Sequence, residues 1–209
     1  MTKAVFVVRV DNFLPKLCVL TIPTIKAYAD KIKADYIEIT ERKFPDFPPT
    51  YEKMQIYELG KNYDHCLLID ADFLIHPDAP DFTAGIFPGY VGFLDGFAAD
   101  LYFELDKYFK ADGRNVGLAA NFVLTDQATH KLWEPLAEPW SVARTKTKRE
   151  FIIDEYCLSR NLAKYKLKFT GLNYSDKIKH HFQHLGVGGD GQTGYLEKAR
   201  EILELWKRG

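Results

Sequence analysis

The chain contains 209 residues, of which 46% are hydrophobic and 27% are charged, and its formal net charge is −1. This composition is typical of a globular protein, and the near-neutral charge provides no field that would attract nucleic acid or an anionic membrane surface. No apolar run approaches the roughly 20 residues of a membrane-spanning helix, and the N-terminal apolar run is too short for a signal peptide because Asp11 follows it. We therefore expect one domain without a membrane span.

The cysteines are Cys18, Cys66 and Cys157, an odd number of widely spaced residues that each lie in an apolar stretch. This arrangement is typical of reduced core residues rather than of a disulfide or a metal site. Since reduced thiols persist in the cytosol, we expect a cytoplasmic protein.

The N-terminal segment predicts two strands with a helix between them. The β-branched run "KAVFVVRV" (3–10) predicts the first strand, and "DYIEIT" (35–40) predicts the second. Apolar residues recur at helical spacing over 14–32, where Pro23 should kink the helix or split it.

A second helix and a third strand follow a proline-rich loop. "TYEKMQIYELGK" (50–61) predicts a helix with Thr50 as its N-cap. "HCLLID" (65–70) is apolar on both faces, as a central parallel strand is. Three strands joined by helices indicate a right-handed α/β sheet.

The second half of the chain predicts mixed elements without an internal repeat. We expect strands at 90–96, 116–124, 166–172 and at the start of 179–194, and helices at 126–136, 149–162 and 195–208. The helix at 126–136 should open at Asp126. The order βαβαβ followed by mixed elements favours a doubly wound sheet with an irregular second half.

Two carboxylates, Asp70 and Asp72, follow the most apolar of these strands. In open α/β sheets ligands bind beyond the carboxyl ends of the strands, and residues two apart in an extended chain point to the same side. Their mutual repulsion favours a divalent cation such as Mg²⁺ or Mn²⁺, which would neutralise charge on a leaving phosphate. The alternative is that Asp70 caps the following turn and Asp72 is solvated.

The segment "YEKMQIYELGKNYDHCLLIDADFLIHPD" (51–78) resembles the central segment of GT-A glycosyltransferases, where a helix precedes a strand ending in Asp-x-Asp. It is most similar to the glycogenin, galactosyltransferase and xylosyltransferase-like group, and more narrowly to domains of large algal-virus glycosyltransferases. The resemblance implies an α/β GT-A fold, with a Rossmann-like mixed sheet and helices on both faces. It implies a single GT-A domain over 1–209, either alone or within a longer chain, located in the host cytoplasm if viral.

The same resemblance implies an activity and a donor site. It implies transfer of a hexose or deoxyhexose from a UDP-sugar to a saccharide or glycoprotein-glycan acceptor, with retention of configuration and with Mn²⁺ or Mg²⁺ as cofactor. Lys53 matches a basic residue that reaches the donor, with a solvated surface lysine as the alternative. The donor-binding residues that it implies are Val8, Arg9, Val10, Thr40, Lys53, Asp70, Ala71 and Asp72.

A histidine near the C-terminus, followed closely by glycine, is a third metal ligand in the family. "HHFQHLGVGG" (180–189) offers His184, favoured by "HLG", or His181, favoured by "HF", and either would favour Mn²⁺ over Mg²⁺. The glycine-rich segment is not a P-loop, because Gln192 stands where the lysine is needed. Its glycines let backbone amides approach a diphosphate, or they form a flexible connection; they are Gly186, Gly188 and Gly189.

Four residues are candidates for the acceptor side. Asp154 and Glu155 begin a helix. They either act near the reacting sugar, or they only stabilise the helix through a favourable interaction with its dipole. Asn121 matches a strand that faces the sugar in the family, and Asp95 ends the strand at 90–96. Two other function classes stay open: a non-catalytic nucleotide-sugar-binding module, and a haloacid dehalogenase-type phosphohydrolase, which normally carries Asp-x-Asp on its first strand.

Overall fold

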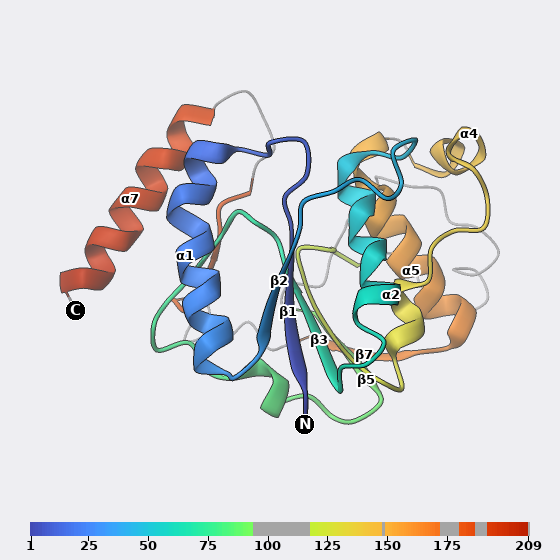
Figure 1. Cartoon of the computed structure of the whole chain (residues 1–209), viewed down its shortest axis with the longest axis horizontal. Helices are drawn as coiled ribbons and strands as arrows, with labels where there is room; N and C mark the ends of the chain where they lie inside the picture. Colours follow the sequence, from blue (N-terminus) through green and yellow to red (C-terminus); the bar gives the residue numbers. More distant parts are fainter. Residues whose placement is uncertain (94–117, 148, 172–179, 187–191, 209) are drawn as a thin grey trace.

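The computed structural model describes residues 1–93, 118–147, 149–171, 180–186 and 192–208. Figure 1 shows a central sheet with helices on both sides, and β4 and β8 form a separate pair. The strands are β1 (Lys3–Val8), β2 (Asp35–Ile39), β3 (His65–Ile69), β4 (Phe73–Ile75), β5 (Tyr90–Phe93), β6 (Phe122–Asp126), β7 (Lys168–Gly171) and β8 (Phe182–His184). The longer helices are α1 (Pro15–Lys31), α5 (Ile153–Tyr165) and α7 (Gln192–Arg208). The short ones are η1 (Pro49–Gln55), α2 (Ile56–Leu59), η2 (Phe82–Ala84), η3 (His130–Trp133), α4 (Trp140–Ala143), η4 (Arg144–Lys146) and η5 (Glu150–Ile152).

The six-stranded sheet has the order β2-β1-β3-β6-β5-β7. Strands β1, β2 and β3 are parallel, as the βαβαβ order predicted, whereas β6 is antiparallel to both β3 and β5. The sheet is therefore mixed, and its parallel part directs the carboxyl ends of β1 and β3 to one edge.

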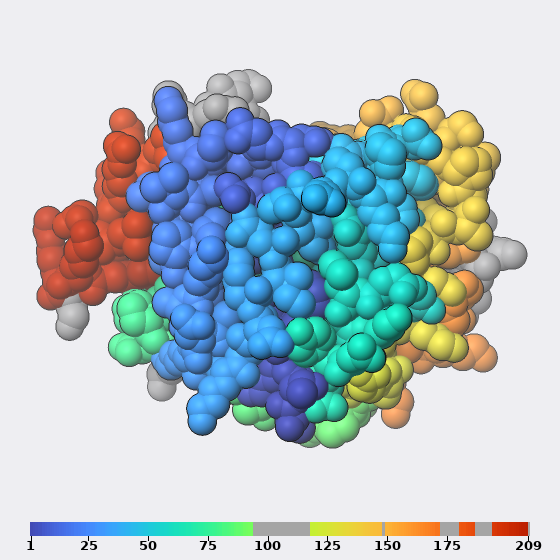
Figure 2. All heavy atoms as spheres, viewed as in Figure 1, coloured from blue at the N-terminus to red at the C-terminus, as the bar shows by residue number. Residues whose placement is uncertain are grey.

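The alternation of β1 divides the core into two layers. Ala4 and Phe6 belong to a cluster with residues of η1 and α5, and Val5 and Val7 belong to a cluster with residues of α1. Figure 2 shows α1 in blue and the η1–α2 segment in cyan on one face of the molecule, with α7 in red beside α1. Helices on both faces, as expected, bury the sheet on both sides.

Several local predictions were wrong. Helix α1 is not split at Pro23, because this proline is exposed and the carbonyl that loses its donor belongs to exposed Val19. Thr50 is not an N-cap: Pro48 precedes η1, and the Thr50 hydroxyl instead donates to the carbonyl of Phe151 at 2.8 Å. The residue type alone was a misleading signal at this position.

The predicted helix at 126–136 is also largely absent. Asp126 ends β6, and its carboxylate accepts a hydrogen bond from the backbone N–H of Thr129 at 2.9 Å. Only His130–Trp133 form a short helix, η3. The three cysteines are buried and free, as expected, and no helix in the described part of the chain is long and apolar enough to cross a membrane.

Candidate functional site

The two carboxylates lie in a tight turn that joins β3 to β4. The Phe73 N–H donates to the Asp70 carbonyl at 3.2 Å, which closes the turn. The Asp70 N–H donates to the Asn121 carbonyl at 2.8 Å, so the turn is also tied to the residue before β6. The carboxylates converge as predicted, but the reason differs: the chain turns between them instead of continuing extended.

His184 completes a group of three possible metal ligands. Asp70, Asp72 and His184 each offer one ligand atom, and these atoms all lie within 4.8 Å of one another. The antiparallel pairing of β4 with β8 sets Phe73 opposite His184, and the two rings stack with centroids 4.7 Å apart. Among the described residues, no other group of three such side chains is this close.

His181, the alternative histidine, does not join this group. Its carbonyl accepts a hydrogen bond from the N–H of His76 at 2.8 Å, and its ring lies edge-on to the His76 ring at 5.5 Å. The structure thus brings His184, and not His181, to the carboxylates. Since β8 begins only at Phe182, its three residues give no periodicity that separates the two histidines by sequence.

The electrostatics of the group follow from burial and neighbouring charge. Burial raises the pKa of Asp70 to about 6, against the opposing effect of the Lys53 ammonium. Burial alone would also raise the pKa of Asp72, but the hydrogen bond and charge of His184, 3.3 Å away, lower it. Burial works to lower the pKa of His184, and Asp72 outweighs it, so that this pKa is raised.

Lys53 is not a solvated surface lysine, because its ammonium contacts three acceptor groups of the protein itself. Its side chain is 7% exposed, and its ammonium lies 2.8 Å from Asp70 Oδ1 and 2.8 Å from Asp154 Oδ2, and donates to the Ala120 carbonyl at 2.8 Å. Burial opposes its charge, but the two carboxylates prevail and raise its pKa. Lys53 therefore links the Asp-x-Asp turn to the first turn of α5.

Two acceptor atoms in this region lack a hydrogen-bond partner among the described residues. Oδ1 of Asp154 and Oδ1 of Asn121 are buried, and each has no hydrogen-bond partner in the described part of the structure. Beside them, half-buried Glu155 has a pKa raised to about 8 by burial and by the charge of Asp154. Buried acceptors of this kind are normally satisfied, so these two atoms have hydrogen-bonding capacity that the described part of the protein does not use.

A cavity of about 450 Å³ opens next to Lys53 and the Asp-x-Asp turn, whereas Asn121, Asp154 and Glu155 are not among its lining residues. Its lining combines apolar residues with the charged groups of Lys53 and the Asp-x-Asp turn. The lining residues are Val8, Val10, Phe13, Pro49, Thr50, Lys53, Asp70, Ala71, Asp72, His184 and Gly186. Arg9 and Thr40 do not line it; Arg9 pairs with Glu38, and Thr40 is exposed. Predicted Asp95, Gly188 and Gly189 lie outside the described residues.

Phe13, Pro49 and Thr50 line the cavity and were not predicted as site residues from the sequence. A usable signal existed for Phe13, because it lies in the turn after the carboxyl end of β1, which ends at Val8, and α/β sheets bind ligands beyond such strand ends. Pro49 and Thr50 had no such signal, since their position depends on how η1 packs against the sheet.

Solved structures of glycosyltransferases share this architecture. A glycosyltransferase involved in the glycosylation of the major capsid of PBCV-1 matches with a TM-score of 0.59 and 9% identity, over 96% of this chain and 100% of that one. The galactosyltransferase LgtC, solved in complex with donor and acceptor sugar analogues, matches with a TM-score of 0.52 and 12% identity, over 98% and 95%. No protein-family model and no curated protein matches the sequence.

The chain therefore has the GT-A fold of glycosyltransferases, as the resemblance implied, with a candidate metal site at its Asp-x-Asp turn. This fold argues against the haloacid dehalogenase alternative. The Asp-x-Asp follows the third strand rather than the first, and the neighbour of β3 on one side is antiparallel.

Proposed function

We propose that residues 1–209 form a single GT-A domain that acts as a metal-dependent glycosyltransferase. It transfers a hexose or deoxyhexose from a UDP-sugar to a saccharide or glycoprotein-glycan acceptor, with retention of configuration. The observation that carries the proposal is the convergence of Asp70, Asp72 and His184 on one side of a cavity at the carboxyl edge of the sheet. The three buried free thiols support a cytoplasmic location.

The donor set fits a divalent cation. Two carboxylates and one imidazole suit Mn²⁺ better than Mg²⁺, since Mn²⁺ accepts an imidazole nitrogen as a ligand more readily than Mg²⁺ does. Asp70, Asp72 and His184 would hold this cation, which would supply positive charge to neutralise the departing UDP diphosphate. Lys53 fixes the orientation of Asp70, and Asn121 Nδ2, which lies 3.3 Å from His184 Nδ1, orients the imidazole.

The cavity has the size and polarity of a nucleotide site. Its volume lies within the range of roughly 300–1,000 Å³ typical of small-molecule sites. Val8, Val10 and Phe13 give one part an apolar wall for the uracil and ribose, and the Asp-x-Asp turn gives another part its charge for the diphosphate. Gly186, with a φ of 62°, lets the backbone approach the diphosphate closely.

Acceptor atoms next to Lys53 serve the reacting sugars in this proposal. Oδ1 of Asp154 and Oδ1 of Asn121 accept hydrogen bonds from sugar hydroxyls, because each is buried without a protein partner in the described structure. The ionised Glu155 takes a proton from the acceptor hydroxyl, and its pKa of about 8 allows this transfer near neutral pH. Asp95 stays a further acceptor-side candidate on the basis of its sequence position.

Release of UDP from a panel of UDP-sugars, with and without Mn²⁺, tests the proposal. We expect Mn²⁺-dependent UDP release for one or a few donors, and none from an Asp72→Asn variant whose thermal unfolding matches that of the parent. Calorimetry with UDP and Mn²⁺ separates the alternative: a nucleotide-sugar-binding module would bind both and never release UDP. Binding of GDP or ADP in preference to UDP would refute the donor assignment.

A further inference from the structure

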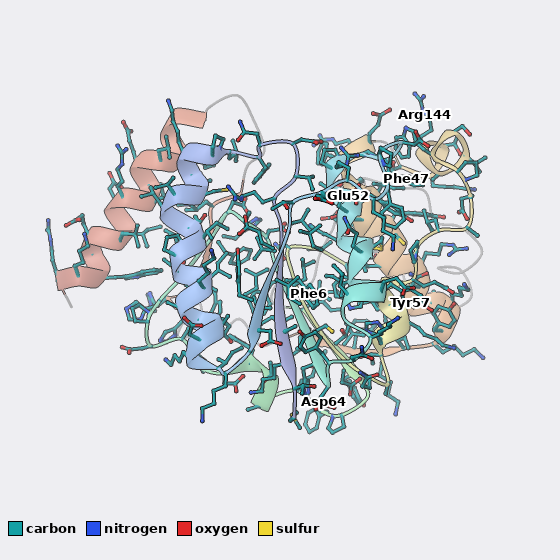
Figure 3. All side chains as sticks on the ribbon, viewed as in Figure 1. Phe6, Phe47, Glu52, Tyr57, Asp64 and Arg144 are labelled. Carbon is teal, nitrogen blue, oxygen red and sulfur yellow. The ribbon has the colours of Figure 1, made fainter. Side chains whose placement is uncertain are left out.

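Two loops border the apolar part of the cavity. The β1–α1 turn (residues 9–14) contributes Val10 and Phe13, and the β2–η1 loop (residues 40–48) leads into the lining residues at the start of η1. Figure 3 places Phe47 and Glu52 towards the edge of the sheet that carries this cavity, and Asp64 at the opposite edge. An interaction that holds these two loops in place therefore also holds Val10 and Phe13 of the apolar wall in place.

The β1–α1 turn has an unfavourable backbone conformation. Asp11 and Asn12 each have a φ of 53°, and Leu14 has a φ of 35°, so three non-glycine residues within four positions are left-handed. Aspartate and asparagine tolerate this region better than most residues do, but leucine does not. A conformation of this kind persists only where the surrounding structure holds it, and it is found preferentially at functional sites.

Arg42 connects this turn to the β2–η1 loop. Its Nη1 donates to a carboxylate oxygen of Asp11, and its Nε donates to Glu52 Oε1 at 2.8 Å. Its Nη2 donates to the carbonyls of Phe44 and Phe47. The arginine thus reaches both loops with one planar group, which is a geometry that lysine does not provide.

Glu52 holds Arg42 in place. Glu52 is fully buried, and its carboxylate also accepts hydrogen bonds from the N–H groups of Lys43 and Phe44, both at 2.9 Å. Gln55 donates to the same carboxylate at 2.8 Å. A buried carboxylate with this many donors is rigid, so the guanidinium that it binds is a fixed point for the more exposed Asp11.

We propose that Asp11 is a positioning residue for the nucleotide end of the donor site. Arg42, fixed on Glu52, holds Asp11 and thereby keeps the strained turn in the conformation that presents Phe13 to the cavity. This inference rests on the proposed function for the identity of the ligand. The contact between Arg42 and Asp11, in contrast, is a property of the protein alone. The Asp11 side chain is 51% exposed, so its removal leaves the core intact.

The experiment compares Asp11→Ala with Asp46→Ala, an exposed aspartate of the β2–η1 loop that serves as a control for the loss of one negative charge. Hydrogen exchange without ligand should become faster in residues 9–14 and 42–48 of Asp11→Ala and stay unchanged in the control. UDP affinity in the presence of Mn²⁺ should fall about three- to fivefold for Asp11→Ala, as expected when one partly exposed ion pair no longer organises a site.

A double-mutant cycle separates positioning from general stability. In a Phe13→Ala background, Asp11→Ala should cause less than about a twofold further loss of UDP affinity, because the residue that it positions is gone. Exchange rates in the two loops that do not change in Asp11→Ala would overturn the inference, whether or not UDP binds. If the parent binds no UDP while exchange in both loops accelerates as expected, the positioning role stands and the proposed function fails. Equal UDP affinity of parent and Asp11→Ala would overturn the inference alone.

Discussion

Replacing Lys53 by methionine should destabilise the protein far more than the loss of one ion pair usually does. The side chain is 7% exposed and reaches three acceptors at 2.8 Å, two of them carboxylates. Methionine keeps the aliphatic packing but removes the charge, which leaves Asp154 buried without a partner for either oxygen. Breaking a buried pair in this way costs about 3–5 kcal/mol of unfolding free energy.

The loss of unfolding free energy in Lys53→Met should increase as pH rises. The pKa of Asp70 is already raised to about 6 with Lys53 in place, and it rises further when the opposing ammonium is removed. A group whose folded pKa exceeds its unfolded value near 3.9 destabilises the fold increasingly as pH rises through the folded pKa. The deficit of Lys53→Met should therefore be largest above pH 7 and should shrink as pH falls towards about 5.

Urea unfolding of the metal-free protein at these two pH values measures both effects. Lys61→Met is the matched control, because Lys61 is 61% exposed and lies 3.5 Å from an exposed Glu58, a pair worth less than about 1 kcal/mol. A loss of stability below about 1 kcal/mol for Lys53→Met, equal at both pH values, would contradict this prediction and would mean that water solvates the two aspartates.

Three further predictions concern other parts of the site and fold. His184→Ala should weaken Mn²⁺ binding at least about tenfold in calorimetry, whereas His181→Ala should bind like the parent; the reverse order would move the ligand to the other histidine. UDP release should increase as pH rises through about 8 if the ionised Glu155 is the form that takes a proton, and Glu155→Gln should lose this limb of the profile. Gly60→Ala should lower the unfolding free energy by about 1–3 kcal/mol, because the new Cβ would lie 2.6 Å from a cysteine sulfur and 2.8 Å from a backbone oxygen, while Gly85→Ala, with its nearest atom at 3.8 Å, should not. Equal stabilities of the two glycine variants would show that the chain near residue 60 shifts freely.

The parallel half of the fold could be predicted because its signals are local. A β-branched run gives β1, and a run that is apolar on both faces gives β3, which the structure buries completely. The position of Asp70 at the carboxyl edge follows from these runs alone. The predictions about Thr50 and Asp126 failed because each residue bonds to a distant segment instead of starting a helix: the Thr50 hydroxyl donates to the Phe151 carbonyl, and the Asp126 carboxylate accepts from the Gly89 N–H.

The sequence could not assign the third ligand or the state of Lys53. His184 reaches Asp72 because three-residue β8 pairs with three-residue β4, and strands this short carry no periodicity. Lys53 is buried because two carboxylates compensate its charge, and Asp154 comes from a helix in the other half of the chain. Neither pairing is visible in the residues that flank the lysine.

An Asp-x-Asp motif therefore says less about a site than the contacts around it do. Residues 1–93 contain both carboxylates, but the groups that complete the site come from later segments: His184 from β8, Asp154 from α5 and the Asn121 carbonyl from the turn before β6. Two adjacent carboxylates at a buried position repel each other unless positive charge compensates them. Here Lys53 supplies that charge to Asp70 and His184 supplies it to Asp72, so the site can form only when both halves of the chain have packed together. The tertiary contacts, rather than the tripeptide, are what turn these two aspartates into a preorganised candidate cation site.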